Sequence, residues 1–279
     1  MKIAALAATT LLAGSALAGP GIFDGDECRH TAPRRVAAPI SGVTKVVIHA
    51  EAGSLKVDGT NGVSQIVADG TACTSDEDFL SRMTLTTRRQ GSELHISADI
   101  PDKSVIFGFF QARLDFAVTL PPGLPVVIDD DSGWIKVTNT GALTIDDDSG
   151  SIEVQNIRGP VSITDDSGSI ALDTIYGQVT IEDDSGEIVV KNVHGSVEIE
   201  DDSGSITVAK IQGSVRISED DSGSIIAQNI QGDVVIDDDG SGGIQVADVG
   251  GRFHVGHKTS GGIDYVRVSG RVTVPEKHR

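Results

Sequence analysis

The chain has 279 residues, of which 41 are acidic and 22 are Lys or Arg, and its formal net charge at pH 7 is −19. A chain this acidic repels phosphates and anionic membrane surfaces, so we exclude nucleic acid as a partner and expect cations or basic partners. No run of about 18 apolar residues follows the N-terminal segment, so we predict no transmembrane helix.

Residues 1–18 have the features of a secretory signal peptide. Lys2 precedes a short run rich in Ala, Leu and Thr, and the segment ends in Ala16-Leu17-Ala18, a small-x-small cleavage site. Ser15 stands where a lipoprotein signal needs its lipidated cysteine, so we expect no lipid anchor. We predict an exported protein that is periplasmic, secreted or associated with the cell surface.

Residues 19–40 contain several Gly and Pro residues and are predicted to form an extended N-terminal arm. The chain has two cysteines, Cys28 in this arm and Cys73 in the region that follows. An even number of cysteines in an exported protein favours a disulfide, which here would tie the arm to the first β region. The alternative is two unpaired, buried thiols.

Residues 41–127 are predicted to form an N-terminal β cap. Short segments of this region alternate apolar and polar residues, as strands with one buried face do, and Pro121, Pro122 and Pro125 end the pattern. We expect an antiparallel hairpin of this cap to fold over the end of the region that follows.

Four aromatic residues form a candidate contact patch. Phe107, Phe109 and Phe110 lie at the predicted tip of the hairpin, where they either cover the open end of the core or contact a partner or a membrane surface. Trp134 either packs against the cap or is an exposed platform on which a sugar could stack.

Residues 128–274 contain a short repeat, and a basic tail follows at 275–279. Ser-Gly occurs shortly before an apolar residue eight times, at steps of 17 to 19 residues, and another glycine follows half a period later. A fixed short period indicates one structural unit stacked on copies of itself. The serines are Ser132, Ser149, Ser167, Ser185, Ser203, Ser222, Ser241 and Ser260.

One unit shows how such a coil buries its apolar residues. Because side chains alternate along a strand, Ile152 and Val154 lie on one inward face. Val161 and Ile163 lie on another, with Ile157 at the corner between them. Coils about 4.8 Å apart would stack these residues into apolar ladders. We therefore predict an all-β fold, a right-handed parallel β-solenoid of about eight coils of 18–19 residues.

The recurring SGSIxVxxIxGxVxI pattern, behind a signal peptide and an N-terminal region with two cysteines, resembles the bacterial putative-adhesin family of β-strand-repeat proteins. The resemblance covers residues 40–274 and implies a β-solenoid whose molecular function is unassigned. This sequence differs from the family pattern because acidic residues, rather than small polar ones, precede almost every Ser-Gly.

Aspartates precede seven of the eight Ser-Gly pairs, and with three glutamates they make 20 of the 41 acidic residues. In one interpretation, one aspartate of each turn caps backbone N–H groups, aided by the serine hydroxyl, while the other faces water. In the alternative, divalent cations, above all Ca²⁺, bind between successive coils. The candidate metal ligands are Asp130, Asp131, Asp147, Asp148, Asp165, Asp166, Asp183, Asp184, Asp201, Asp202, Asp220, Asp221, Asp238 and Asp239.

The crowding of these aspartates has a consequence for stability in either interpretation. Neighbouring negative charges would raise the carboxyl pKa values in the folded chain. We therefore expect the metal-free fold to become more stable as the pH falls from neutral to mildly acidic values.

Enzyme activity is not expected. The coil length is constant, so no long loop is available to build a pocket, and no histidine recurs with the Asp-Ser-Gly units. We predict a non-enzymatic module, adhesin-like or structural and associated with the envelope, without a cofactor and with a protein or envelope component as partner. The alternatives are a Ca²⁺-binding repeat module and, more remotely, an enzyme acting on polysaccharides.

Overall fold

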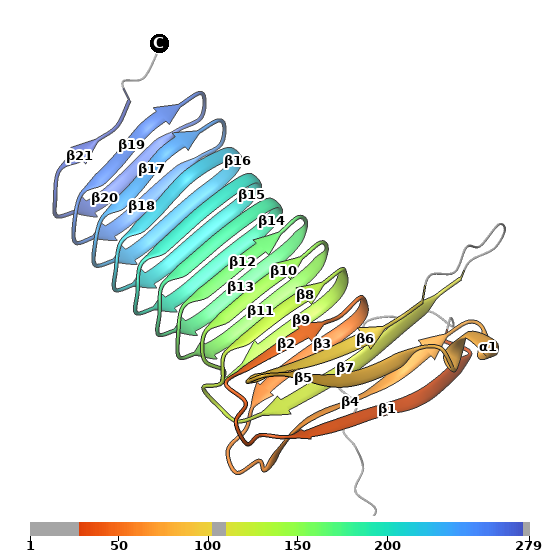
Figure 1. The fold of residues 1–279 in the computed structure, drawn as a ribbon. Helices are drawn as coiled ribbons and strands as arrows, with labels where there is room; N and C mark the ends of the chain where they lie inside the picture. Colours follow the sequence, from red (N-terminus) through yellow and green to blue (C-terminus); the bar gives the residue numbers. More distant parts are fainter. Residues whose placement is uncertain (1–27, 102–109, 276–279) are drawn as a thin grey trace, which may run out of the picture.

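The computed structural model describes residues 28–101 and 110–275, which form a long rod with a β-rich cap at one end (Figure 1). The described part is almost entirely β, with 21 strands and one four-residue helix, α1 (Glu77–Leu80). The stacked parallel strands confirm the prediction of an all-β solenoid. The predicted signal peptide lies outside the described residues.

The rod from β8 onward consists of coils with one strand segment before each Ser-Gly turn and one after it. Neighbouring coils pair in parallel, residue by residue, and β14, β15 and β16 continue through the turn. The strands are β8 (Val126–Asp130), β9 (Ser132–Thr138), β10 (Leu143–Asp147), β11 (Gly150–Ile157), β12 (Val161–Asp165), β13 (Gly168–Ile175), β14 (Val179–Val193), β15 (Val197–Ile211), β16 (Val215–Ile230), β17 (Val234–Asp239), β18 (Ile244–Val249), β19 (Phe253–Lys258), β20 (Ile263–Val268) and β21 (Val272–Thr273).

Equivalent apolar residues stack directly on one another in the core. Ile170 pairs in register with Ile152 on one neighbouring coil and Ile188 on the other, and all three are at most 1% exposed. The corner residue Ile157 and the strand residue Val161 are buried as well. Each fully buried Val or Ile stabilises the fold by roughly 2 kcal/mol. Because every coil repeats these positions, the predicted apolar ladders are present along the rod.

Glycine is required at the two corners of a coil for different reasons. Gly168, in a Ser-Gly pair, has a φ of +145°, and a Cβ there would lie 1.5 Å from the carbonyl oxygen of Gly150. Gly195, in the second glycine row, lacks such a φ, but a Cβ would lie 2.3 Å from the carbonyl oxygen of Gly177. The left-handed residue at this corner comes three positions earlier, at Asn192 with a φ of +56°.

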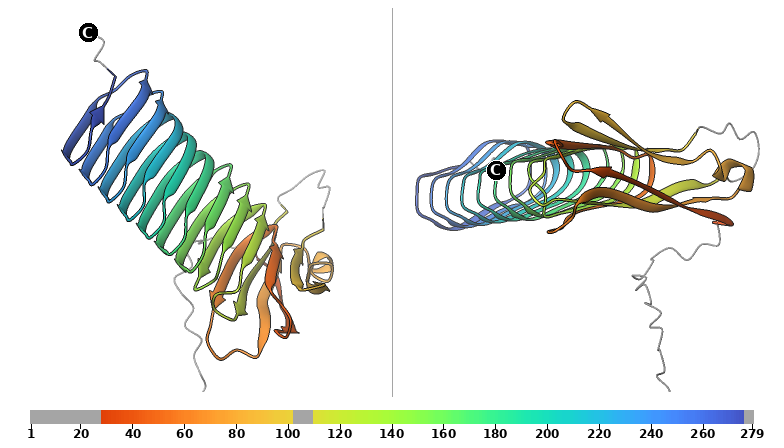
Figure 2. Two further views of the ribbon diagram at one scale, coloured as in Figure 1. Left: turned by 60° about the vertical axis from the view of Figure 1, so that its left-hand side comes forward. Right: turned by 60° about the horizontal axis from the view of Figure 1, so that its bottom comes forward.

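Seven strands and α1 precede β8 in the chain. Figure 2 shows the red-to-yellow segments gathered at one end of the rod. β1 pairs antiparallel with β4, β4 with β7, and β5 with β6, which confirms the predicted antiparallel N-terminal pairing. The arm predicted at 19–40 contributes β1, all ten residues of which pair with β4. These strands are β1 (His30–Pro39), β2 (Lys45–His49), β3 (Ala52–Gly59), β4 (Gln65–Thr74), β5 (Thr84–Gln90), β6 (Glu93–Asp99) and β7 (Ala112–Leu120).

The stack of parallel strands begins before the first Ser-Gly repeat. β2 and β3 pair in parallel with β8 and β9, and Gly53, with a φ of +131°, lies in register with Gly133. On their other side, β2 and β3 pair in parallel with β6 and β7. The order along the rod is therefore β6–β7, then β2–β3, then β8–β9, which is not the order along the chain.

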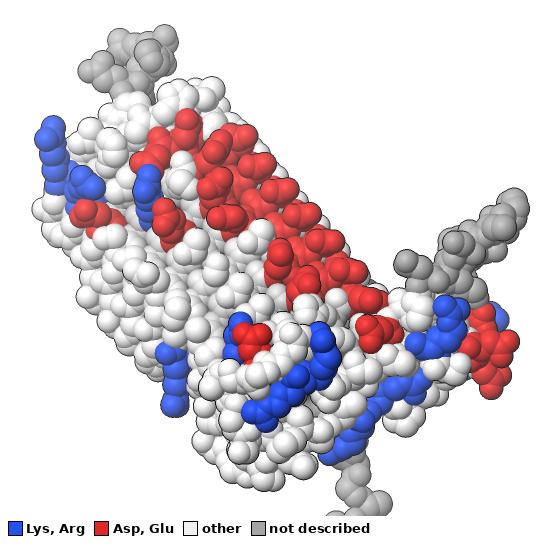
Figure 3. All heavy atoms as spheres, in the orientation of Figure 1, with Lys and Arg blue, Asp and Glu red and all other residues white. Residues whose placement is uncertain are grey.

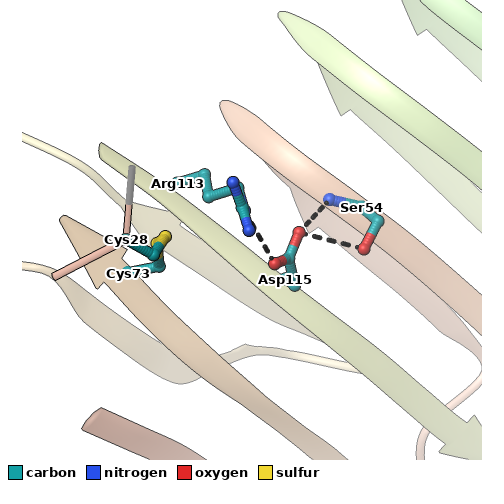
Figure 4. Close-up of polar contacts among 5 residues, drawn as sticks. All are labelled: Cys28, Ser54, Cys73, Arg113 and Asp115. Atoms are coloured by element: carbon teal, nitrogen blue, oxygen red, sulfur yellow. Dashed lines mark hydrogen bonds and ion pairs between the residues drawn. A yellow bond between two sulfur atoms is a disulfide. The ribbon is translucent and has the colours of Figure 1, made fainter. Parts of the chain in front are cut away.

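A disulfide joins Cys28 to Cys73 of β4, with the two Cα atoms 5.5 Å apart (Figure 4). Close to it, Asp115 of β7 accepts hydrogen bonds from the backbone N–H of Ser54 at 2.8 Å and from its hydroxyl at 3.0 Å. Arg113 Nε donates to the same carboxylate at 3.0 Å. The disulfide thus ties the N-terminal segment to the cap, and Asp115 connects the cap to the β2–β3 coil.

At the opposite end of the rod, β20 pairs with β18 and β21 pairs with β19. Tyr265 of β20 lies in register with the buried Val246 but is 50% exposed, because it belongs to the last coil of the described stack. Its ring packs on that of Phe253, with the centroids 5.8 Å apart. Within the described residues, no helix has the length and apolar character needed to span a membrane.

Candidate functional site

An acidic seam runs along one edge of the rod (Figure 3). It consists of the aspartates before the Ser-Gly turns, which form two rows. In the row of inner aspartates, each residue is at most 4% exposed; its members are Asp130, Asp147, Asp165, Asp183, Asp201, Asp220 and Asp239. The outer aspartates follow them in sequence and are exposed; they are Asp131, Asp148, Asp166, Asp184, Asp202 and Asp221.

The strand alternation continues through the first aspartate of each turn and directs it inward. On β12, Ile163 and Asp165 are both buried, two positions apart. Asp165 Oδ1 accepts the backbone N–H of Ser167 at 3.3 Å, so the carboxylate caps the turn. Asp183 and Asp201 cap their turns in the same way, at 3.3 and 3.1 Å. The interpretation of one capping and one water-facing aspartate is therefore confirmed at these turns.

The serine hydroxyls of the turns link neighbouring coils. Ser185 Oγ donates to the backbone carbonyl of Asp166 on the preceding coil at 3.3 Å, and Ser203 Oγ donates to that of Asp184 at 3.3 Å. The hydroxyl was expected to help cap its own turn. Its observed role is different, because it ties two successive turns together.

Burial raises the pKa of the inner aspartates well above the ordinary value of a carboxyl group. The pKa is about 7 for Asp165 and about 6 for Asp183. Removal from water is the largest cause in both cases, and negative neighbours raise the pKa further. The sequence predicted this rise from the crowding of charges, but the inward orientation of the row makes burial the dominant cause.

Inner and outer aspartates do not converge on a common point, because they lie on opposite faces of the strand. Asp165 is buried, whereas Asp166 beside it is exposed. Across residues 28–101 and 110–275, no three His, Cys, Asp or Glu side chains are grouped so as to hold a metal ion. Binding of Ca²⁺ by the predicted ligands stays a prediction.

Basic groups meet the acidic seam at the β19 end. Lys258 lies in register with Asp239, and its Nζ is 2.6 Å from Asp239 Oδ2, with both side chains at most 4% exposed. Beside this pair, His257 Nδ1 lies 2.9 Å from Oδ1 of Asp238, which is exposed. The last predicted metal ligands, Asp238 and Asp239, are therefore already engaged by side chains of the next coil.

A groove of ≈ 780 Å³ follows the other corner of the coils, half a coil along the chain from the acidic seam. One wall of the groove is formed by the residue with positive φ at this corner of each coil. The opposite wall is formed by the residue two positions later in the sequence, and a buried Val or Ile lies between the two walls. An ion pair between Asp248 and Arg267 lies at one end. Among the lining side chains are Asn192, His194, Lys210, Gln212, Asn229 and Gln231.

Two backbone N–H groups along this groove are already used for pairing between coils. The backbone N–H of Gln212 donates to Val193 at 2.9 Å, and that of Gln231 donates to Ile211 at 2.9 Å, so both are used between coils. At the groove's β14 end, the ring of His194 stacks on that of Tyr176 at 4.7 Å. The sequence analysis missed this site, for which the only signal was the polar residues around the second glycine of each repeat.

The two described aromatic residues of the predicted contact patch, Phe110 and Trp134, lie in different parts of the fold. Phe110 packs edge-on against Phe79 of α1, with centroids 4.8 Å apart, and lies against the core. Trp134 of β9 is 40% exposed, and the ammonium of Lys136 lies 5.8 Å from its ring centre. Phe107 and Phe109 lie outside the described residues.

These features define a class, a capped parallel β-solenoid with an acidic seam at one corner of its coils and a polar groove at the other. Residues 65–233 match the Toastrack DUF4097 family model, and the chain belongs to this family. The family resemblance inferred from the repeat is thus confirmed. Among curated proteins, none matches the sequence.

Solved structures resemble the chain over most of its length. A putative adhesin from Bacteroides fragilis is 15% identical, with 88% of this chain and 96% of that chain covered and a TM-score of 0.42. A putative cell adhesion protein from Clostridium sporogenes is 12% identical (85% and 100% covered, TM-score 0.30). A putative lipid binding protein from Parabacteroides distasonis is 17% identical (87% and 97% covered, TM-score 0.33).

Proposed function

We propose that this protein is a non-enzymatic, exported binding module, adhesin-like or associated with the cell envelope, whose partner binds in the groove. The observation that carries the proposal is the groove itself, which extends over five successive coils of a rigid stack. Its amide side chains, such as Gln212 and Gln231, recur at the spacing of the coils. Such a surface suits an extended partner with polar groups at regular intervals.

Binding to the cell envelope tests this proposal. Purified chain without the predicted signal peptide, residues 19–279, would be sedimented with isolated envelope fragments of the source organism. We expect co-sedimentation that falls at least tenfold in the double variant Gln212→Ala/Gln231→Ala. The matched control is Gln155→Ala/Gln228→Ala, because these two glutamines are exposed outside the groove. Equal binding by both variants, or no binding by the parent chain, would contradict the proposal.

Binding of divalent cations is a second candidate function. It is favoured by the outer aspartates, which place one exposed carboxylate on each of six successive turns. Thermal unfolding of residues 19–279 in EDTA, in millimolar Ca²⁺ and in millimolar Mg²⁺ tests it. A rise of ten degrees or more with Ca²⁺ alone would support a calcium module, and identical curves would contradict it.

A further inference from the structure

Polar side chains without partners line the middle of the groove. Lys210 and Asn229 belong to the wall of residues with positive φ, and Gln212 and Gln231 belong to the opposite wall. All four are exposed, and none of these side chains has a hydrogen bond or an ion pair with another of the described residues. Each amide offers both a donor and an acceptor. The groove therefore presents free hydrogen-bonding groups on both walls over two successive coils.

The groove carries little net charge, although the chain as a whole is strongly acidic. Among the described residues that line it, Asp248 is the only acidic one, and Arg267 of the next coil binds it with Nη2 2.7 Å from Oδ2. Lys210 is the only lysine or arginine of this lining without an acidic partner. A polymer with many charges, of either sign, gains little attraction from such a surface. The lining suits neutral hydroxyl and amide groups instead.

A polypeptide strand has no free sheet edge to pair with at this groove. On the opposite wall, each backbone N–H donates to a carbonyl oxygen of the preceding coil at 2.8 or 2.9 Å; these residues are His194, Gln212, Gln231, Gly250 and Ser269. Addition of a strand requires an unpaired edge. An extended polypeptide also repeats its side chains on one face about every 6.6 Å, whereas coils lie about 4.8 Å apart. Its side chains would therefore lose register with the coils.

A linear sugar polymer matches the spacing and the chemistry of the groove. A β-1,4-linked hexopyranose chain advances by nearly one coil spacing per sugar ring, so successive sugars meet equivalent side chains. Sugar hydroxyl groups donate and accept hydrogen bonds, as the amides of Gln212 and Gln231 do. Gly250 interrupts the opposite wall and leaves space for a ring substituent such as an acetamido group. The coils of the groove span a length of about 19 Å, which accommodates about five sugars.

An aromatic surface lies at the β14 end of the groove. The rings of Tyr176 and His194 stack with their centroids 4.7 Å apart and with 16° between their planes. His194 lines the groove, and Tyr176, on the preceding coil, is 52% exposed. An aromatic ring presents a large apolar face beside a polar group, and the apolar face of a sugar ring packs on such a surface. The pair therefore supplies the stacking contact that the amides lack.

We propose that the groove binds a linear β-1,4-linked glycan that carries acetamido groups. One sugar ring stacks on the Tyr176–His194 pair, and the amide side chains of the following coils hydrogen-bond to the next sugars. This inference rests on the proposed function, because it names the class of partner that the groove binds.

Isothermal titration of residues 19–279 with β-1,4-linked oligomers of N-acetylglucosamine tests the proposal. We expect the affinity to increase with the length of the oligomer up to about five sugars, the number that the groove accommodates, and then to stay constant. No binding of the pentamer would overturn the proposal. Equal affinity for the dimer and the pentamer would overturn it as well, because the groove would then not be the site.

Variants assign the bound glycan to the groove. Tyr176→Ala should weaken binding of the pentamer about tenfold, the effect of one lost aromatic contact. Trp134→Ala, which removes an exposed aromatic ring outside the groove, should leave it unchanged. Gln231→Glu keeps the shape of the side chain but removes its donor, and should weaken binding about fivefold. Its charge-matched control is Gln228→Glu, at an exposed position outside the groove. Equal effects of a variant and its control would overturn the assignment.

Envelope fragments stripped of protein by protease and detergent separate this inference from the proposed function. Co-sedimentation with stripped fragments that the pentamer displaces would support both. Co-sedimentation with intact fragments alone would mean a protein partner, which leaves the proposed function standing and overturns the glycan inference. Binding of the pentamer without binding to any fragments would support the glycan site and contradict the proposed function. Binding of polyglutamate in place of the pentamer, lost in Lys210→Gln, would make the groove a site for anions and overturn the inference.

Discussion

The side chains of Lys258 and Asp239 form a buried ion pair between two successive coils, with Nζ 2.6 Å from Oδ2. Lys258 stands at the register position where the preceding coils carry an inner aspartate. The pair therefore ends the row of inner aspartates with the opposite charge. Its Coulomb attraction acts away from water, where it is strongest and where removal of one partner is most costly.

Lys258→Met is expected to lower the free energy of unfolding by about 3–5 kcal/mol, because it leaves Asp239 buried without a counter-charge. Urea unfolding at pH 7 measures the effect. Asp239→Asn in the same chain should restore most of the loss. Lys191→Met, at an exposed position, should cost less than about 0.5 kcal/mol. Equal stability of Lys258→Met and the parent chain would show that the ion pair is not stabilising.

Stability is expected to fall as the pH rises from 5 to 8. In the folded protein Asp165 retains its proton up to about pH 7, whereas the ordinary aspartate value is 3.8. The folded state therefore binds more protons than the unfolded state between these values, and its stability decreases with pH until the inner aspartates are ionised. The midpoint of urea unfolding in EDTA, measured at unit steps of pH, checks the sign. A urea midpoint that increases from pH 5 to pH 8 would contradict this prediction.

Gly168→Ala should destabilise the protein by about 3 kcal/mol or more, through both backbone strain and a steric clash. The φ of +145° disfavours a side chain, and the added Cβ would meet the carbonyl oxygen of Gly150. Gly243→Ala is the matched control, because no atom lies within 4 Å of its added Cβ. Thermal unfolding of both variants gives the comparison, and equal melting temperatures would contradict the role assigned to Gly168.

Phe110→Ser and Trp134→Ser should differ in their effect on stability. Phe110 packs against Phe79 and the core, so its loss is expected to cost about 3 kcal/mol. Trp134 is 40% exposed, so its replacement should cost less than about 1 kcal/mol. The two free energies of unfolding check this, and a larger loss for Trp134→Ser would mean that its ring packs more tightly than described.

The solenoid could be predicted from the sequence because each coil repeats the same local rules. The alternation of Ile152 and Val154, and the Ser-Gly turn at Gly150, recur in register, so one coil defines the others. The β2–β3 coil was not recognised from the sequence. Its segment 52–57 has the turn glycine and the inward-facing apolar residues Leu55 and Val57, but no aspartate precedes the turn. The segment also lies much further from the first Ser-Gly pair than the 17 to 19 residues that separate the repeats.

The seam and its division into one capping and one water-facing aspartate per turn were predicted from the sequence, but the burial of the capping row was not. Alternation already places Asp165 inward after Ile163, yet an ionisable residue is expected to face water, and the two arguments conflict. The turn N–H of Ser167 favours the inward position. The groove was not predicted, because it is formed by side chains from five stacked coils. These side chains flank a corner at which one residue of each coil has a positive φ, and the sequence of a single repeat does not show how far apart they lie.

The position of β2–β3 between β6–β7 and β8–β9 gives the rod two unlike ends. On one side, β5 pairs with β6 and β4 pairs with β7, both antiparallel, so the series of parallel coils ends there. On the other side, each coil pairs in parallel with the next, as far as β20 and β21. Parallel stacking in register is therefore open at one end only, so a longer or shorter series of repeats would change the length of the rod and leave the cap unchanged.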